Sequence, residues 1–113
     1  MKRIAFGRFG EDIAEKFLKD KGIKIIDRNV RTPFGEIDII GEENEKIYFV
    51  EVKTRRNTNF GLPVEAVNKR KKAHMVNSAM FYLRGREKDF EIGVISILFN
   101  GENFNVEYTT EIF

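Results

Sequence analysis

Three charged residues stand inside two short apolar runs of the sequence. Asp38 lies in "GEIDII", and Glu51 and Lys53 lie in "FVEVKTR". Two carboxylates that share a partly desolvated space repel each other unless a cation lies between them, and hard divalent cations prefer oxygen ligands. The pattern therefore indicates a metal site made of Asp38, Glu51 and the backbone carbonyl of Val52, with Lys53 beside it.

Such a site suits the hydrolysis of a phosphodiester. A metal held by carboxylates neutralises the phosphate and lowers the pKa of a bound water, while a lysine orients that water and stabilises developing charge. Removing either acid is expected to leave the metal-free protein at least as stable, because the repulsion disappears. The competing interpretation makes Glu51 and Lys53 a surface ion pair and Asp38 a solvent-facing residue, since such common residue types match the spacing easily.

The first half of the chain predicts one helix and three strands that position these residues. Apolar residues recur at helical spacing over 3–20, with Glu11 at the edge of the apolar face. Strands are predicted at 23–31, 35–40 and 46–55, and the turn-like breaks between them predict an antiparallel meander. Alternation places Asp38 and Ile40 on one side of their strand and Ile37 and Ile39 on the other.

The second half predicts a loop over 56–67, a helix over 69–84 and two further strands. The apolar residues expected to share the buried face of this helix are Ala73, Val76, Ala79, Met80 and Leu83. The run 90–99 is apolar on both faces, as in a central strand, and Asn100-Gly101 turns the chain into a last strand over 103–113. The order α-β-β-β-α-β-β predicts a single α/β domain over 1–113, a mixed sheet flanked by two helices.

Composition narrows the class of protein. The chain has 113 residues, 42% of them hydrophobic, no cysteine and a net charge of +2. It lacks a segment long enough to span a membrane, so a cytoplasmic protein is expected. Basic residues are clustered, either as solvated faces or as contacts to a nucleic-acid backbone; the candidates are Arg31, Arg55, Arg56, Lys69, Arg70, Lys71 and Lys72. His74 is the only histidine, and a surface or phosphate-contacting role is expected for it.

Four motifs in order, "GRFGEDIAEKFL", "RTPFGEIDIIG", "FVEVKTR" and "FGLPVEAVNKRKKAH", resemble the YraN-like family of small uncharacterised bacterial proteins. That family resembles the PD-(D/E)xK, restriction-endonuclease-like superfamily, and within it the archaeal Holliday junction resolvases. The resemblance implies an αβββαβ core, here with an extra C-terminal strand, and a nuclease site that uses Mg²⁺ or Mn²⁺. The catalytic positions carried over are Glu11, Asp38, Glu51 and Lys53.

The resemblance predicts a metal-dependent DNA endonuclease, acting on branched or duplex DNA. The alternative is a nucleic-acid-binding protein on a nuclease scaffold, without turnover, because a fold does not guarantee a function. Resolvase-like relatives act as dimers, which implies a homodimer, whereas a monomer of this size would nick or trim. One departure is Gly93, which stands where the family usually carries an aspartate.

Overall fold

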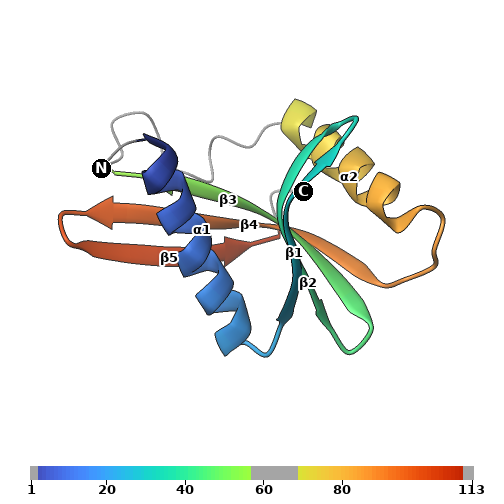
Figure 1. Cartoon of the computed structure of the whole chain (residues 1–113), viewed down its shortest axis with the longest axis horizontal. Coiled ribbons are helices and arrows are strands. Elements are labelled where there is room, and N and C mark those ends of the chain that lie inside the picture. The colour runs from blue at the N-terminus through green and yellow to red at the C-terminus, as the bar shows by residue number, and fades with distance from the viewer. Residues whose placement is uncertain (1–2, 57–68, 111–113) are drawn as a thin grey trace.

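Two helices and five strands follow one another in the predicted order. A computed structural model describes residues 3–56 and 69–110, with side chains described from Arg8 onward. The elements are α1 (Arg3–Asp20), β1 (Lys24–Thr32), β2 (Gly35–Glu43), β3 (Lys46–Arg55), α2 (Lys69–Leu83), β4 (Phe90–Asn100) and β5 (Asn103–Thr109) (Figure 1). Most of the predicted loop 56–67 and the end of the predicted last strand lie outside the described residues.

The five strands form one mixed sheet in the order β1-β2-β3-β4-β5. The strands β1, β2 and β3 form the predicted antiparallel meander, β4 runs parallel to β3, and β5 returns antiparallel to β4. Figure 1 shows β1 and β2 running steeply across the direction of β4 and β5, so the sheet is strongly twisted. A mixed α/β fold is confirmed.

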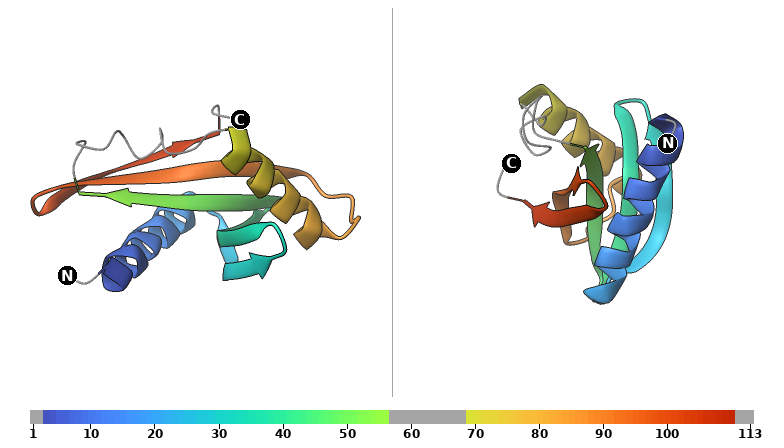
Figure 2. Two further views of the ribbon diagram at one scale, coloured as in Figure 1. Left: turned by 90° about the horizontal axis from the view of Figure 1, so that it is seen from above. Right: turned by 90° about the vertical axis from the view of Figure 1, so that its left-hand side faces the viewer.

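The helices cover opposite faces of the sheet, and each builds its own core (Figure 2). On the α1 side the fully buried side chains include Leu18, Ile39, Val50 and Ile95. On the α2 side they are Ile37, Ile40, Ile47, Phe49, Ala79 and Leu83. The inner strands contribute to both cores because alternate residues point to opposite faces. Among the described residues, no helix is long and apolar enough to cross a membrane.

Close backbone approach and one arginine fix α1 on the sheet. A Cβ atom at Gly10 would overlap the hydroxyl of Thr54, so only glycine lets the helix lie this close to β3. Arg28 of β1 then binds three acids of the helix, with its guanidinium nitrogens 3.1 Å from Glu11, 2.9 Å from Asp12 and 3.4 Å from Glu15. The helix is therefore held against both β3 and the edge strand β1.

The buried face of α2 differs from the predicted one. Ser78 is buried with Ala79 and Leu83, whereas Ala73 and Met80 are exposed. Ser78 is accepted there because its hydroxyl lies 2.8 Å from the hydroxyl of Thr32, which gives it a hydrogen-bond partner. The helix is thus rotated about its axis from the orientation predicted from its apolar residues alone. In the observed orientation Ser78, a polar residue, contacts the β1–β2 turn.

Gly93 lies under an aromatic ring on the α1 side of the sheet. A Cβ atom at this position would lie 2.5 Å from the ring of Tyr108, whose hydroxyl donates a 2.6 Å hydrogen bond to Glu91. Burial and the Glu91 carboxylate raise the pKa of Tyr108 above its ordinary value. Tyr108 therefore occupies the space in which a side chain at position 93 would lie.

Substituting Gly93→Ala should force Tyr108 aside and weaken its bond to Glu91. We expect a loss of about 1–3 kcal/mol in the free energy of unfolding, the usual cost of overpacking, measured by urea denaturation. In a Tyr108→Ala background the same substitution should cost little, since coupled neighbours are not additive. An equal cost in both backgrounds would show that the Tyr108 ring is not the obstacle.

Candidate functional site

The pairing of β2 with its neighbours is interrupted at Asp38. Toward β3, the ladder ends with Ile39 opposite Val50, one position before Asp38 would face Glu51. Toward β1, Arg28 pairs with Ile39 and Val30 pairs with Ile37, but Asn29 and Asp38 between them are not paired with each other. Asn29 has a φ of 54°, a left-handed conformation that asparagine tolerates. The sheet therefore opens at this point.

The Asp38 carboxylate takes the place of the missing strand partner. Its Oδ2 atom accepts a 2.7 Å hydrogen bond from the backbone N–H of Val52. Because the N–H and C=O of a residue point to the same edge of a strand, the Val52 carbonyl is directed into the same gap. Asp38 and the carbonyl proposed as an oxygen ligand thus meet where the strands separate.

The simple alternation predicted for β2 fails beside Asp38. Ile37 packs with Ile40 in the core under α2, whereas Ile39 packs in the core under α1. The prediction that Ile37 and Ile39 share a side is therefore wrong. The reason is the interruption at Asn29 and Asp38, which turns the end of β2 toward α2.

Glu51 is buried between two lysine ammonium groups. Only 7% of the residue is exposed. Its Oε1 atom lies 2.9 Å from the Nζ atom of Lys53 on the same strand and 3.3 Å from the Nζ atom of Lys71 on α2. The predicted closeness of Glu51 and Lys53 is confirmed, and Lys71, predicted only as a DNA contact, joins them.

Asp38 and Glu51 line one pocket of about 210 Å³, room for several water molecules. One wall is the β1–β2 turn and the start of β2, and the other is a face of α2. The lining residues are Phe34, Gly35, Glu36, Asp38, Glu51, Lys71, His74, Met75 and Ser78. The two acids separated by thirteen positions in the sequence therefore share one solvent-accessible space.

The two carboxylates have different electrostatic environments. Burial, together with the negative charge of Glu51, raises the pKa of Asp38 to about 7, although the Val52 N–H bond opposes this. Glu11 and Glu36 add smaller contributions in the same direction. Glu51 is paired with Lys53 and Lys71, and Lys71 also interacts electrostatically with Asp38. At Asp38 burial is the largest effect, and it favours the protonated form of the carboxyl group.

The two lysines are also unequal. Burial lowers the pKa of Lys53 against the pull of Glu51, and the neighbouring Lys71 lowers it further. Burial also acts to lower the pKa of Lys71, but Lys53 and Glu51 outweigh it and the pKa is raised. Lys53 therefore holds its proton less tightly than an ordinary lysine, and Lys71 holds its proton more tightly.

Glu11 lies apart from the pocket lining. Its carboxylate accepts hydrogen bonds from Arg28, at 3.1 Å, and from the side-chain amide of Asn29, at 3.2 Å. Its charge nevertheless contributes to the raised pKa of Asp38. Glu11 thus supports the interrupted position from the α1 side, and its catalytic assignment stays a prediction.

The predicted basic residues fall into separate groups. Lys69 and Arg70 are exposed at the start of α2, near Lys71 of the pocket, and Lys72 is half-buried. Arg55 is the last residue of β3 and Arg56 follows it, and the Arg55 guanidinium lies 2.8 Å from the Thr54 carbonyl oxygen. Arg31 lies elsewhere, in a hollow of about 380 Å³ that also contains Arg84 and Arg86. Neither of these last two arginines was among the predicted basic residues.

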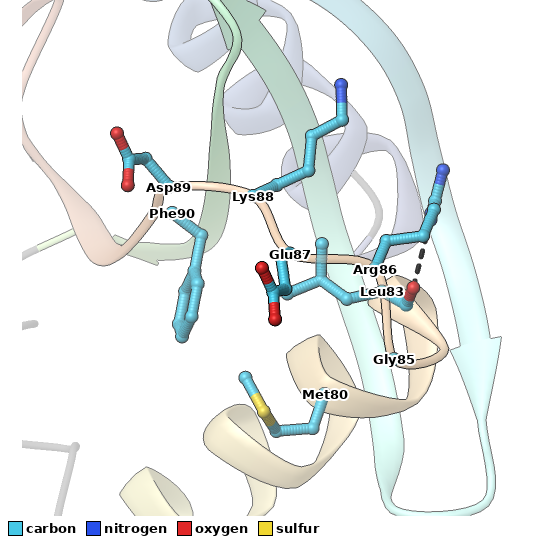
Figure 3. A pocket seen from close by; sticks show the side chains of 8 residues that line it. All are labelled: Met80, Leu83, Gly85, Arg86, Glu87, Lys88, Asp89 and Phe90. Atoms are coloured by element: carbon cyan, nitrogen blue, oxygen red, sulfur yellow. Dashed lines mark hydrogen bonds between the residues drawn. The ribbon is translucent and has the colours of Figure 1, made fainter.

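A larger hollow, of about 570 Å³, lies at the C-terminal end of α2. Figure 3 shows Met80 and Phe90 on its two sides. The loop that closes it alternates in sign through Arg86, Glu87, Lys88 and Asp89, and Arg86 caps the helix by donating to the carbonyl of Leu83 at 2.9 Å. Its lining carries charges of both signs, whereas the smaller pocket brings Asp38 and Glu51 together with Lys71, so the smaller pocket is the better candidate site.

The fold and pocket define a small mixed α/β protein with two acids and two lysines where the sheet opens. Residues 10–97 match the uncharacterised protein family UPF0102. The chain is 42% identical over 110 residues to a UPF0102 protein of Syntrophotalea carbinolica, covering 95% of this chain and 89% of that one. It is 37% identical to a UPF0102 protein of Dictyoglomus turgidum over the full length of both.

The chain therefore belongs to the UPF0102 family. The sequence resemblance to the YraN-like family of uncharacterised bacterial proteins is confirmed.

The raised pKa of Asp38 makes its effect on stability depend on pH. Because the folded-state pKa of about 7 lies well above the ordinary pKa of an aspartate, the folded protein binds the proton more tightly than the unfolded chain does. This contribution to stability is lost as pH rises from about 4 through 7. Asp38→Asn keeps an oxygen for the Val52 N–H and removes the charge. Without metal, it should match the wild type near pH 4 and exceed it by roughly 1–4 kcal/mol above pH 7.

Urea denaturation of both proteins from pH 4 to 8.5 measures this difference. The other charges facing Asp38, from Glu11, Glu36, Glu51, Lys71 and His74, are common to both proteins. Asp38→Ala is the matched control, because it removes the charge and also the hydrogen-bond acceptor, and should be less stable than Asp38→Asn. A pH-independent difference between wild type and Asp38→Asn would contradict the assignment.

Glu51→Gln should behave in the opposite way. The substitution leaves Lys53 and Lys71 close together without their carboxylate. For Glu51 this geometry favours a loss of stability over the sequence-based expectation that either acid could be removed freely. We expect destabilisation at neutral pH of up to about 3–5 kcal/mol, the cost of breaking a buried ion pair, less to the extent that Lys53 sheds its proton. The same denaturation series measures it, and unchanged stability would show that the lysines do not depend on Glu51.

Proposed function

We propose that this protein is a metal-dependent DNA endonuclease with a restriction-endonuclease-like fold. The observation that carries the proposal is the pocket that Asp38 and Glu51 share at the point where the sheet opens. Lys53 forms an ion pair with Glu51 there. The observed order of helices and strands agrees with an αβββαβ core followed by one extra strand. Opening a sheet exposes polar backbone groups, which a structural site would avoid and a ligand site uses.

The donor atoms at this position suit Mg²⁺ or Mn²⁺. Asp38 and Glu51 line one pocket, and the Val52 carbonyl is directed into the gap between the strands. A metal ion bound here would use these three oxygen donors. Among the described residues there is no group of three His, Cys, Asp or Glu side chains placed to hold a metal ion. That fits Mg²⁺, which keeps several waters and is bound by one or two carboxylates. A bound ion would neutralise phosphate charge and acidify a water.

The two lysines would have different tasks in the reaction. Lys53, whose pKa is lowered, would orient a water molecule at Nζ and exchange a proton there. Lys71 keeps its proton and would contribute positive charge beside the phosphate. Glu11 would support Asp38 through Asn29 and its own charge. The basic residues at the start of α2 and the end of β3 would contact the DNA backbone, which positions the substrate without reading its sequence.

A second function, DNA binding without turnover, is favoured by one observation. Glu51 is already neutralised by Lys53 and Lys71, so half of the acid pair needs no metal for its charge balance. In that case the basic residues would bind DNA and Asp38 would remain a protonated or strained acid. The two functions differ in their response to metal.

Cleavage of DNA should require the divalent metal and the pocket acids. Purified protein is incubated with branched, flapped and linear DNA, with and without Mg²⁺ or Mn²⁺. We expect metal-dependent products from the wild type, and at least 100-fold lower rates for Asp38→Asn and for Lys53→Met, the scale of a lost acid–base or electrostatic group. Sedimentation of the protein with branched DNA tests the homodimer that paired cuts would need.

Thermal unfolding gives a readout independent of activity. Metal at ten times its dissociation constant stabilises the native state by about 1.4 kcal/mol, or roughly 5–10 °C for a domain of this size. The wild type should show this rise at millimolar metal, and Asp38→Asn should not. Tight, salt-dependent DNA binding with neither cleavage nor a metal response would support the binding function instead. Cleavage that survives in Asp38→Asn would overturn the site.

A further inference from the structure

Phe34 is an exposed aromatic residue at the mouth of the candidate pocket. It lies in the turn between β1 and β2, and 45% of the residue is exposed. It lines the same pocket as Asp38 and Glu51, and it belongs to neither of the core clusters of the described residues. Other phenylalanines, such as Phe104, are similarly exposed, so it is the position of Phe34 beside the two pocket acids that distinguishes it.

The turn that carries Phe34 is held in place by side-chain hydrogen bonds. The Thr32 hydroxyl accepts the backbone N–H of Phe34 at 3.1 Å and donates to the carbonyl of Gly35 at 2.8 Å. The same hydroxyl lies 2.8 Å from the Ser78 hydroxyl of α2. Pro33 restricts the backbone immediately before Phe34. The ring is therefore presented from a turn anchored to the helix that forms the other wall of the pocket.

The two walls of the pocket mouth differ in charge, so a DNA phosphate would favour one wall and a base the other. Lys71 and His74 line the α2 wall, and Lys69 and Arg70 are exposed one turn earlier on the helix. Glu36 stands two residues beyond Phe34 on the other wall and would repel a phosphate there. An incoming strand would therefore pass its backbone along α2 and turn its bases toward Phe34.

We propose that Phe34 stacks on an unpaired base next to the scissile phosphate, and that the substrates are DNA structures with unpaired nucleotides at the cleavage position. This inference rests on the proposed nuclease function and names its substrate class. Bases in a continuous duplex are stacked on each other and offer no free face to a ring. Unpaired bases at a branch, flap or bubble do, and stacking on an aromatic side chain is worth about 1–3 kcal/mol per base.

The test measures DNA binding in EDTA, so that no cleavage is needed. Two probes share one sequence with 2-aminopurine at one position, unpaired in a bubble in the first and paired in a duplex in the second. Phe34→Ala should weaken binding to the bubble by about 5–150-fold, the equivalent of that stacking energy, and change duplex binding less than twofold. Stacking by the wild type should quench 2-aminopurine in the bubble, and Phe34→Trp should retain both binding and quenching.

The matched control is Phe104→Ala. Phe104 is 43% exposed and lies at the start of β5, next to the turn that joins it to β4, and it does not line the pocket. This variant should bind both probes like the wild type, and thermal unfolding confirms that each variant is folded.

The possible outcomes separate the two proposals. Equal binding of the bubble by Phe34→Ala and wild type would overturn the stacking role, even where the wild type cleaves DNA. An equal loss on bubble and duplex would overturn it as well, because the effect would not depend on an unpaired base. Selective loss on the bubble without any metal-dependent cleavage would support stacking and overturn the nuclease function alone. Absence of binding to either probe by the wild type would overturn the stacking role, and absence of metal-dependent cleavage as well would overturn the nuclease function.

Discussion

The interruption of β2 at Asp38 is the feature on which the rest of the site depends. A continuous ladder would pair the backbone of β2 with Val52 and leave the Asp38 side chain on a flat sheet. Instead the strands separate, the Asp38 carboxylate accepts the Val52 N–H, and a pocket forms between the sheet and α2. Asn29 makes the interruption tolerable, because its left-handed backbone and its bond to Glu11 accommodate the break on the β1 side.

The charges in the pocket are arranged unequally around this gap. Glu51 is balanced by two ammonium groups, and Lys71 arrives from α2 only because that helix lies across this face of the sheet. Asp38 has a single backbone donor and faces three other acids, so burial and repulsion raise its pKa. An acid kept near its own pKa at neutral pH is an unusual element of a purely structural site, and perturbed groups in a pocket are typical of functional ones.

The contacts that hold α1 on the sheet and the residues of the candidate site lie on opposite faces of the sheet. On the α1 side lie the tight contact of Gly10, the Arg28 ion pairs and the Tyr108 ring over Gly93. On the α2 side lie Asp38, Glu51, Lys53 and the turn that carries Phe34. Gly93 belongs to the first face, where it leaves room for the Tyr108 ring, and it does not line the pocket.

The sequence by itself determined the order of the elements, because helix and strand periodicity are local properties, and it singled out Asp38, Glu51 and Lys53 as charges in apolar strands. Its four ordered motifs were also sufficient to indicate the family. Three features were decided only by the tertiary structure. The break at Asp38 depends on pairing with two neighbouring strands, the buried face of α2 depends on Ser78 meeting Thr32, and the approach of Lys71 and Phe34 joins segments far apart in the chain. Periodicity reports which side chains share a face, whereas contacts between faces depend on how the helices and strands pack.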